Sequence, residues 1–197
     1  MYAKAIEKIH FVFNNSKIRK FLGKLRVPLC IVVFILLLLH IKSSFLLAGF
    51  LVSLLGELIQ IWCFASLEKN RTLTVRGLYC LTRNPMYLGR FFLILGALIT
   101  TGNIWIIVIF CIVYYFYMIN RVKREEAVLR SVFGLDYDSY CSKVHRFLPS
   151  MKMFRWSSLK YFNWRLLKKN HGHWNILAML LCYLLFYLST LFRSGAH

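Results

Sequence analysis

Residues 77–89 read GLYCLTRNPMYLG and form a turn-rich, partly polar stretch between long apolar runs. Pro85 has no backbone N–H and biases Asn84 toward an extended conformation, so a helix is not expected to run through the middle of this stretch. Gly77 and Gly89 frame it and permit turns or a close approach of the backbone. We therefore expect a loop between apolar helices, either a plain connector or a place for chemistry.

Composition identifies the environment of the chain. Of its 197 residues, 59% are hydrophobic, whereas soluble domains have about 45–50% apolar residues. The formal net charge of +19 is spread between long apolar segments rather than gathered on one polar face. These features indicate an integral membrane protein and argue against a nucleic-acid-binding protein.

The apolar segments define the expected helices. The run from Val27 to Leu67 is too long for one span of about 20 residues and suits two, with a break at residues 42–44. A second hairpin follows residues 77–89, with its turn at residues 101–103. We expect an all-α integral membrane protein with about five transmembrane helices, in which the cytosolic loops form a ligand-binding pocket. The helices expected are 28–41, 45–67, 87–100, 104–119 and 174–192. The first is short for a span, so it is either tilted against its partners or extended back toward Phe21.

Three regions are expected along the chain. Residues 1–26 are basic, and their apolar residues recur at helical spacing, which is typical of an amphipathic arm on a membrane surface. A partly ordered tail is the alternative. Residues 27–150 form the membrane core. Residues 151–197 add a surface helix, expected over residues 153–164 where aromatics alternate with cations, and a final span.

Lysine and arginine indicate the orientation. All but three of the 26 lie in the first arm, in the loop before Tyr87 or in the stretch between the fourth and fifth spans. With five spans these three regions share one side of the membrane. The positive-inside rule therefore predicts that the N-terminus and both polar loops are cytoplasmic.

Cysteine and histidine give no metal signature. The six cysteines include no CxxC pair and are expected to be reduced, small hydrophobic residues. His171 and His173 have no third ligand nearby in the sequence, so no metal site is expected. No GxGxxG motif is present, and no nucleotide-binding fold of that type is expected.

The seven acidic residues include three of interest. Glu57 lies inside an expected span, where a carboxyl group is costly and is either functional or hydrogen-bonded to a neighbouring helix. Arg121 and Glu125 are four residues apart and share a helix face, either as a surface ion pair or as part of a site. Together with Arg83 they form a candidate cluster for a charged ligand at the membrane edge.

An ordered set of motifs resembles one family of membrane enzymes. The motifs are Gly77-x-Tyr79-x3-Arg83-Asn84-Pro85-x-Tyr87-x-Gly89, Glu125-Glu126, Phe133-Gly134-x2-Tyr137-x2-Tyr140 and Arg146-Phe147-Leu148-Pro149. In this order and spacing they resemble the integral membrane methyltransferases, which include isoprenylcysteine carboxyl methyltransferase and the phospholipid methyltransferases. The resemblance covers about residues 56–149.

The resemblance implies S-adenosylmethionine as the cofactor, bound without a Rossmann domain. It implies that Glu125 is the acidic cofactor ligand and that Arg121 binds the substrate, both as catalytic residues. Asn84 stands where many members of the family have histidine, and an amide cannot titrate near neutral pH. The cofactor-binding positions that the resemblance implies are Arg71, Thr72, Leu73, Thr74, Tyr79, Asn84, Pro85, Met86, Tyr87 and Glu125.

The acceptor is expected to be a lipid or lipidated molecule reached from the bilayer. An arginine beside the acceptor favours O-methylation of an anion, such as a prenylcysteine carboxylate or a lipid phosphate, over N-methylation of a phospholipid ammonium group. Two other hypotheses are a reductase that uses NADPH, like the sterol reductases, and a scaffold without catalysis. The sequence predicts no oligomeric state.

Overall fold

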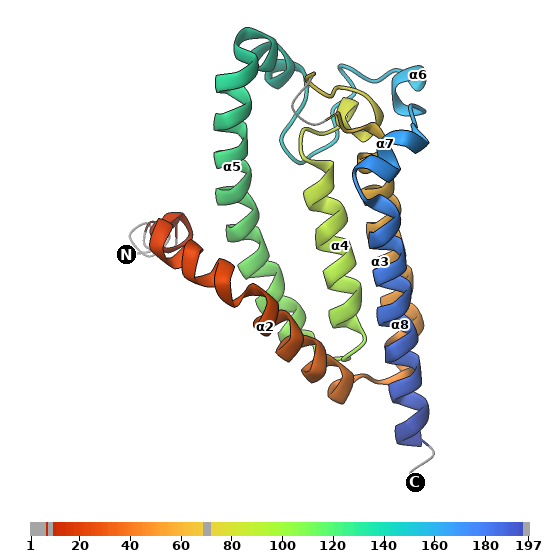
Figure 1. Ribbon diagram of the computed structural model, residues 1–197. Helices are drawn as coiled ribbons and strands as arrows, with labels where there is room; N and C mark the ends of the chain where they lie inside the picture. The colour runs from red at the N-terminus through yellow and green to blue at the C-terminus, as the bar shows by residue number, and fades with distance from the viewer. Residues whose placement is uncertain (1–6, 8–9, 69–71, 195–197) are drawn as a thin grey trace.

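The structure is a computed structural model, and it describes residues 7, 10–68 and 72–194 (Figure 1). This part of the chain is helical and contains no strand, which confirms the expected all-α class. Its elements are α2 (Ser16–His40), α3 (Ser43–Ser66), η1 (Gly77–Cys80), α4 (Pro85–Ile99), α5 (Ile104–Lys143), α6 (Trp156–Leu159), α7 (Trp164–Lys169) and α8 (Gly172–Ser194).

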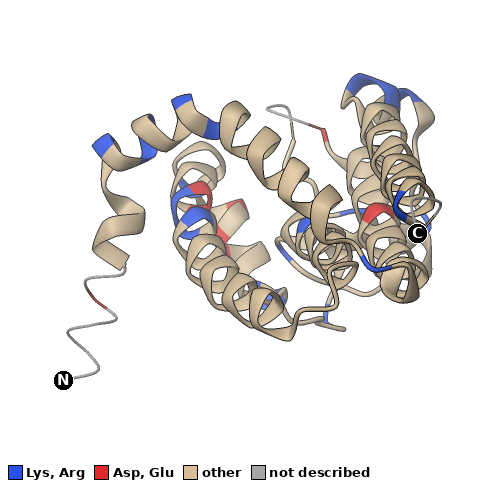
Figure 2. Cartoon of the chain, turned by 90° about the horizontal axis from the view of Figure 1, so that it is seen from below, with Lys and Arg blue, Asp and Glu red and all other residues tan. Residues whose placement is uncertain are grey.

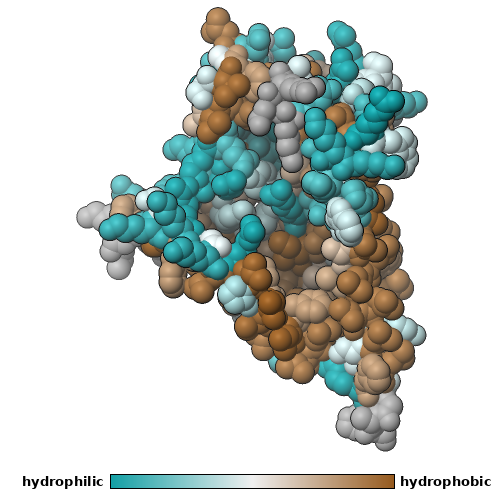
Figure 3. All heavy atoms as spheres, in the orientation of Figure 1, coloured by the Kyte–Doolittle hydropathy of each residue, from teal (hydrophilic) through white to brown (hydrophobic). Residues whose placement is uncertain are grey.

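Four of these helices, α2, α3, α5 and α8, are long and apolar enough to cross a membrane, and α4 is a shorter apolar helix. This agrees with the expected number of about five transmembrane helices. Apolar side chains cover the lower part of the molecule, and polar side chains gather at the upper end around the loops (Figure 3). The protein is therefore a multi-pass membrane protein with one strongly polar end.

Glycine lets α3 and α4 pack backbone to backbone. The two helices are antiparallel, and Gly49 meets Gly96 while Gly56 meets Gly89. A Cβ on Gly56 would lie 2.6 Å from the Gly89 carbonyl oxygen and closer still to the Leu93 backbone nitrogen. Small residues at such a contact allow the close approach by which helices associate in membranes.

Replacing Gly56 with alanine is expected to lower the melting temperature of the detergent-purified protein, by the equivalent of about 1–3 kcal/mol, because backbone atoms cannot move aside for the new methyl group. Gly23→Ala is the matched control, since a Cβ there meets nothing within 4 Å. Equal melting temperatures for the two variants would show that the α3–α4 contact is looser than described.

The first span begins earlier than expected. We expected a helix from about Pro28 or one extended back toward Phe21, but α2 begins at Ser16, and Pro28 lies inside it. The side chain of Asn15 caps the helix by accepting from the backbone nitrogens of Lys17 and Ile18, at 2.9 and 3.4 Å. Lysine and arginine favour helix, so the basic stretch continues the span instead of ending it. Figure 2 shows these cations strung along the first half of α2.

The expected surface helix over residues 153–164 is wrong as a single element. Two short helices, α6 and α7, occur instead, because the chain between them is held by the end of α3: the Asn163 backbone nitrogen donates to the Ala65 carbonyl at 3.1 Å. The Trp62 Nε1 donates to the Leu159 carbonyl at 3.0 Å. The Asn163 side chain then caps α7 by accepting from the Arg165 backbone nitrogen at 2.9 Å.

Helix α5 extends far past its apolar part and then bends. Residues 104–119 were expected to span the membrane, and the helix continues to Lys143. Gly134 interrupts it with φ 51° and ψ −125°, a conformation that glycine adopts without a steric penalty. The bend returns the last turns of α5 toward η1, which brings Tyr137 and Tyr140 to the polar end of the bundle.

Candidate functional site

The loop between α3 and α4 is fixed by the chain that follows α5. The Tyr140 hydroxyl donates to the Tyr79 carbonyl at 2.6 Å, and burial raises the pKa of Tyr140, so this donor keeps its proton. The Arg83 backbone nitrogen donates to the His145 carbonyl at 3.0 Å. Pro85 is the first residue of α4, where its missing N–H costs no hydrogen bond. The two motif strips, residues 77–89 and residues 137–149, therefore form one layer at the polar end of the bundle.

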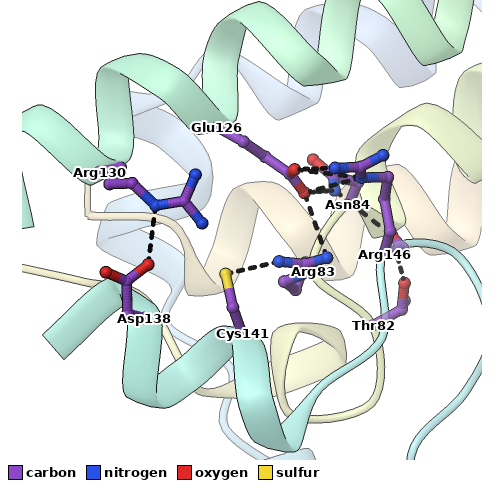
Figure 4. A network of polar contacts seen from close by, with 8 residues as sticks. All are labelled: Thr82, Arg83, Asn84, Glu126, Arg130, Asp138, Cys141 and Arg146. Carbon is purple, nitrogen blue, oxygen red and sulfur yellow. Dashed lines mark hydrogen bonds and ion pairs between the residues drawn. The ribbon is translucent and has the colours of Figure 1, made fainter. Parts of the chain in front are cut away.

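A buried carboxylate, Glu126, joins this layer to α5 (Figure 4). Its side chain is 7% exposed and accepts from the Arg146 Nε at 3.0 and 3.2 Å. The Arg83 guanidinium lies 3.6 Å from the same carboxylate, and the Asn84 amide donates to it at 3.4 Å. Arg83 also donates to the Cys141 sulfur. One carboxylate on α5 thus holds both motif strips.

We expect Glu126→Ala to destabilise the fold by about 3 kcal/mol, because removing one partner of a buried ion pair leaves the other charge uncompensated. Arg83 would be that charge, since its side chain is only 13% exposed. Asp138→Ala is the matched control because it breaks an exposed pair with Arg130, worth less than about 1 kcal/mol. Equal losses of thermal stability in the two variants would contradict the role given to Glu126.

Beside this network lies a cavity of about 760 Å³ between the loop, α5 and the start of α2. Its volume is in the range typical of small-molecule sites. Cations, acids, hydroxyls and apolar groups all contribute to its wall, so it suits a ligand with both charged and apolar parts. The lining residues are Arg19, Leu67, Glu68, Thr72, Leu73, Thr74, Tyr79, Arg83, Arg121, Arg124, Glu125, Val128, Leu129, Val132, Phe133, Tyr137 and Tyr140.

Arg121 and Glu125 meet at the wall of this cavity. The Arg121 Nε lies 2.9 Å from the Glu125 carboxylate, and both side chains are nearly half exposed. The Arg121 Nε also lies 3.4 Å from the Tyr87 hydroxyl, which approaches from α4. The two side chains share one helix face, as the four-residue spacing predicted. Both also line the cavity.

The structure brings part of the implied cofactor set to this cavity. Thr72, Leu73, Thr74, Tyr79 and Glu125 line it with Arg121. Arg71 lies outside the described residues. The other four implied positions do not line it.

Those four positions make other contacts in the structure. Asn84 faces Glu126, and Pro85 is buried at the start of α4. Met86 packs against the cluster of Phe64, Ala65 and Leu167. The Tyr87 hydroxyl lies next to the Arg121–Glu125 pair, 3.4 Å from the Arg121 Nε. Asn84 therefore acts in this structure as a hydrogen-bond donor in the buried network.

Several residues near the site carried too little signal in the sequence. Glu126 belongs to the Glu125-Glu126 motif, but the sequence predicted no role for it. Arg121 precedes Glu125 by four residues, which is a helical spacing, and so only Glu125 was assigned to the site. Arg19 lies on the cavity, and the segment before it is held to α5 by a hydrogen bond from Arg124 to Asn14 at 2.6 Å. No sequence pattern connects residues 10–19 with residues 120–124.

Comparison with known proteins agrees with the motifs. Residues 44–136 match the family model described as phospholipid methyltransferase. Over 82 residues, 42% of this chain, the sequence is 35% identical to protein-S-isoprenylcysteine O-methyltransferase of Schizosaccharomyces pombe, covering 35% of that protein. It is 34% identical over the same length to the probable protein-S-isoprenylcysteine O-methyltransferase of Oryza sativa subsp. indica, covering 43% of it.

A third relative, protein-S-isoprenylcysteine O-methyltransferase of Saccharomyces cerevisiae, is 32% identical over 82 residues, which are 34% of its length. The chain thus spans less than half of the length of these relatives. No solved structure matches it at a significant level. The matched stretch contains α3, α4, most of α5 and the loop beside the cavity. Residues 44–136 are thus similar to the phospholipid methyltransferase family, in agreement with the family that the motifs resemble.

Proposed function

We propose that the protein transfers a methyl group from S-adenosylmethionine to an anionic oxygen on a lipid or lipidated acceptor. A prenylcysteine-type carboxylate is the preferred acceptor, because the three relatives are named for O-methylation of isoprenylcysteine. The observation that carries the proposal is the cavity at the polar end of the helical bundle, where Arg121 and Glu125 are both accessible.

The residues around the cavity fit the proposed cofactor. Glu125 offers a carboxylate to a cationic or hydroxyl group, and Thr72 and Thr74 offer hydroxyls. Leu73, Leu129 and Phe133 give apolar surface for a ring. When bound, S-adenosylmethionine would supply an electrophilic methyl group on a sulfonium. The protein would contribute positioning, which is worth about 7–11 kcal/mol in well-oriented reactions.

The charges around the cavity support an anionic acceptor. Arg121 is bifunctional in this proposal: it pairs with Glu125 and presents its remaining donors to a carboxylate or phosphate. Such an oxygen is already ionised at neutral pH and needs no general base. An ammonium acceptor would be repelled by Arg19, Arg121 and Arg124, so phospholipid N-methylation is the weaker alternative.

The proposed topology places this end of the bundle in the cytoplasm. The basic residues of α2, of the loop before α4 and of residues 121–169 lie on that side under the positive-inside rule. A soluble cofactor would then enter from the cytoplasm, and a membrane-anchored acceptor would enter from the bilayer.

Two measurements on the detergent-purified protein test the proposal. S-adenosylmethionine is expected to raise the melting temperature and NADPH is not, since a ligand stabilises the folded state that binds it. A farnesylated cysteine with a free carboxylate should become methylated, whereas its carboxamide should not. Stabilisation by NADPH alone would favour a reductase, and no stabilisation by either would favour a scaffold.

A further inference from the structure

A second cavity lies in the membrane part of the bundle. It has a volume of about 430 Å³ and is bordered by α3, α4 and α8, with two residues of α2. It shares no lining residue with the cavity that contains Arg121 and Glu125. Helices α3 and α8 lie side by side along its length (Figure 1). We call it the α8 groove.

Polar groups gather at one end of the α8 groove. Gln60 lies near the end of α3, Arg90 near the beginning of α4, and Asn175 near the beginning of α8, so all three are at the polar end of the bundle. Gln60 is only 3% exposed and lines the groove. Its amide offers both a donor and an acceptor to the polar part of a ligand.

The rest of the groove is mostly apolar and runs along α8, as an acyl chain would. Its two hydroxyl groups, on Ser53 and Tyr183, are hydrogen-bonded to each other at 2.7 Å. Below the three polar residues it is lined by Leu93, Ala97, Met179 and Phe186, among others. From Asn175 to Phe186 the helical rise amounts to about 16 Å. The groove therefore has a polar end at the depth of lipid headgroups and an apolar body that runs toward the middle of the bilayer.

Arg90 makes the polar end of this groove selective for an anionic ligand. Its side chain is exposed and forms no ion pair with the described acidic residues. Its guanidinium lies 5.5 Å from the centre of the Tyr87 ring and donates to the Met86 sulfur at 3.4 Å. These weak contacts orient Arg90 but leave its charge uncompensated, so an anion is the complementary ligand.

We propose that the α8 groove binds a bilayer lipid with an anionic headgroup, held by Arg90, Gln60 and Asn175, at a site separate from the methyl-transfer cavity. The acyl chain would lie against α8, which is outside the matched residues 44–136. The inference does not depend on methyl transfer.

Binding is measured by native mass spectrometry and melting temperature, with phosphatidylglycerol and phosphatidylcholine as the two probe lipids. The wild-type protein should retain phosphatidylglycerol more strongly than phosphatidylcholine. Arg90→Gln should weaken phosphatidylglycerol binding about fivefold and remove the preference, because each basic residue near anionic lipid contributes about that much. Arg165→Gln is the matched control, since it removes an exposed cation from α7 at the same end of the molecule, outside the groove.

A variant with a large side chain in the groove tests whether the lipid acyl chain binds there. Ala178 lines the groove and is exposed, so Ala178→Phe fills it without crowding the core and should reduce the retention of both lipids. If this variant melts at a much lower temperature without lipid, Ile94→Trp serves instead, since Ile94 is also exposed in the groove.

Soluble glycerol 3-phosphate should not replace the lipid at the same concentration, because it lacks the chain. The inference would be overturned if Arg90→Gln bound phosphatidylglycerol like the wild type, or if glycerol 3-phosphate stabilised the protein equally. Adding S-adenosylmethionine to the same samples separates this inference from the proposed function. If the protein retained lipid but was not stabilised by S-adenosylmethionine, lipid binding in the α8 groove would be supported and the proposed methyl transfer would be contradicted.

Discussion

Glu125→Ala is expected to abolish binding of S-adenosylmethionine, because it removes the exposed carboxylate on the cavity wall that is proposed to bind the cofactor. The fold should survive, since Glu125 is 40% exposed and its ion pair with Arg121 is worth less than about 1 kcal/mol. Binding is measured by titration of the radiolabelled cofactor, with melting temperature as the check on folding.

Asp138→Asn is the matched control for this variant. Asp138 also forms an exposed pair with an arginine, Arg130, but neither residue lines the cavity. The control should bind the cofactor like the wild type. If Glu125→Ala bound S-adenosylmethionine like the wild type, Glu125 would not be a cofactor ligand. If both variants lost the same amount of binding, the cause would be the general change in charge.

Arg121→Ala is expected to lower the rate of methyl transfer by about 100-fold, because the acceptor anion loses the group that positions it. Binding of S-adenosylmethionine should be spared, since Glu125 remains. A lysine at position 121 keeps the charge but not the bidentate geometry and should give an intermediate rate. The rate is followed with the farnesylated cysteine at saturating cofactor.

Arg130→Ala is the control for Arg121→Ala, because it removes a similarly exposed arginine on the same helix away from the cavity. Full turnover in Arg121→Ala would contradict the assigned role. A loss of cofactor binding in parallel with turnover would assign Arg121 to the cofactor instead of the acceptor.

The fold was predictable to the extent that hydropathy sets it. The apolar runs around residues 45–67, 87–100 and 174–192 occur as α3, α4 and α8. Bilayer thickness accounts for the lengths of α3 and α8, whereas α4 is shorter than a span of about 20 residues. The start of α2 was not predictable from hydropathy, since it depends on the cap at Asn15 and on basic residues that are compatible with helix. The break between α6 and α7 depends on contacts with the end of α3.

The candidate site was predictable where residues are neighbours along a helix. Arg121 and Glu125 meet because a spacing of four places them on one face. Glu126 and Arg146 are 20 residues apart and meet only because α5 bends at Gly134 and the chain then returns. Arg19 reaches the cavity through contacts between residues 10–14 and α5, which no local pattern encodes.

An experimental structure with S-adenosylhomocysteine bound tests the central claim most directly. The ligand should lie between residues 72–79 and α5, with its amino acid or ribose part in contact with the Glu125 carboxylate and its sulfur facing Arg121. Density for the ligand in the α8 groove, or on any surface away from Glu125, would contradict the account.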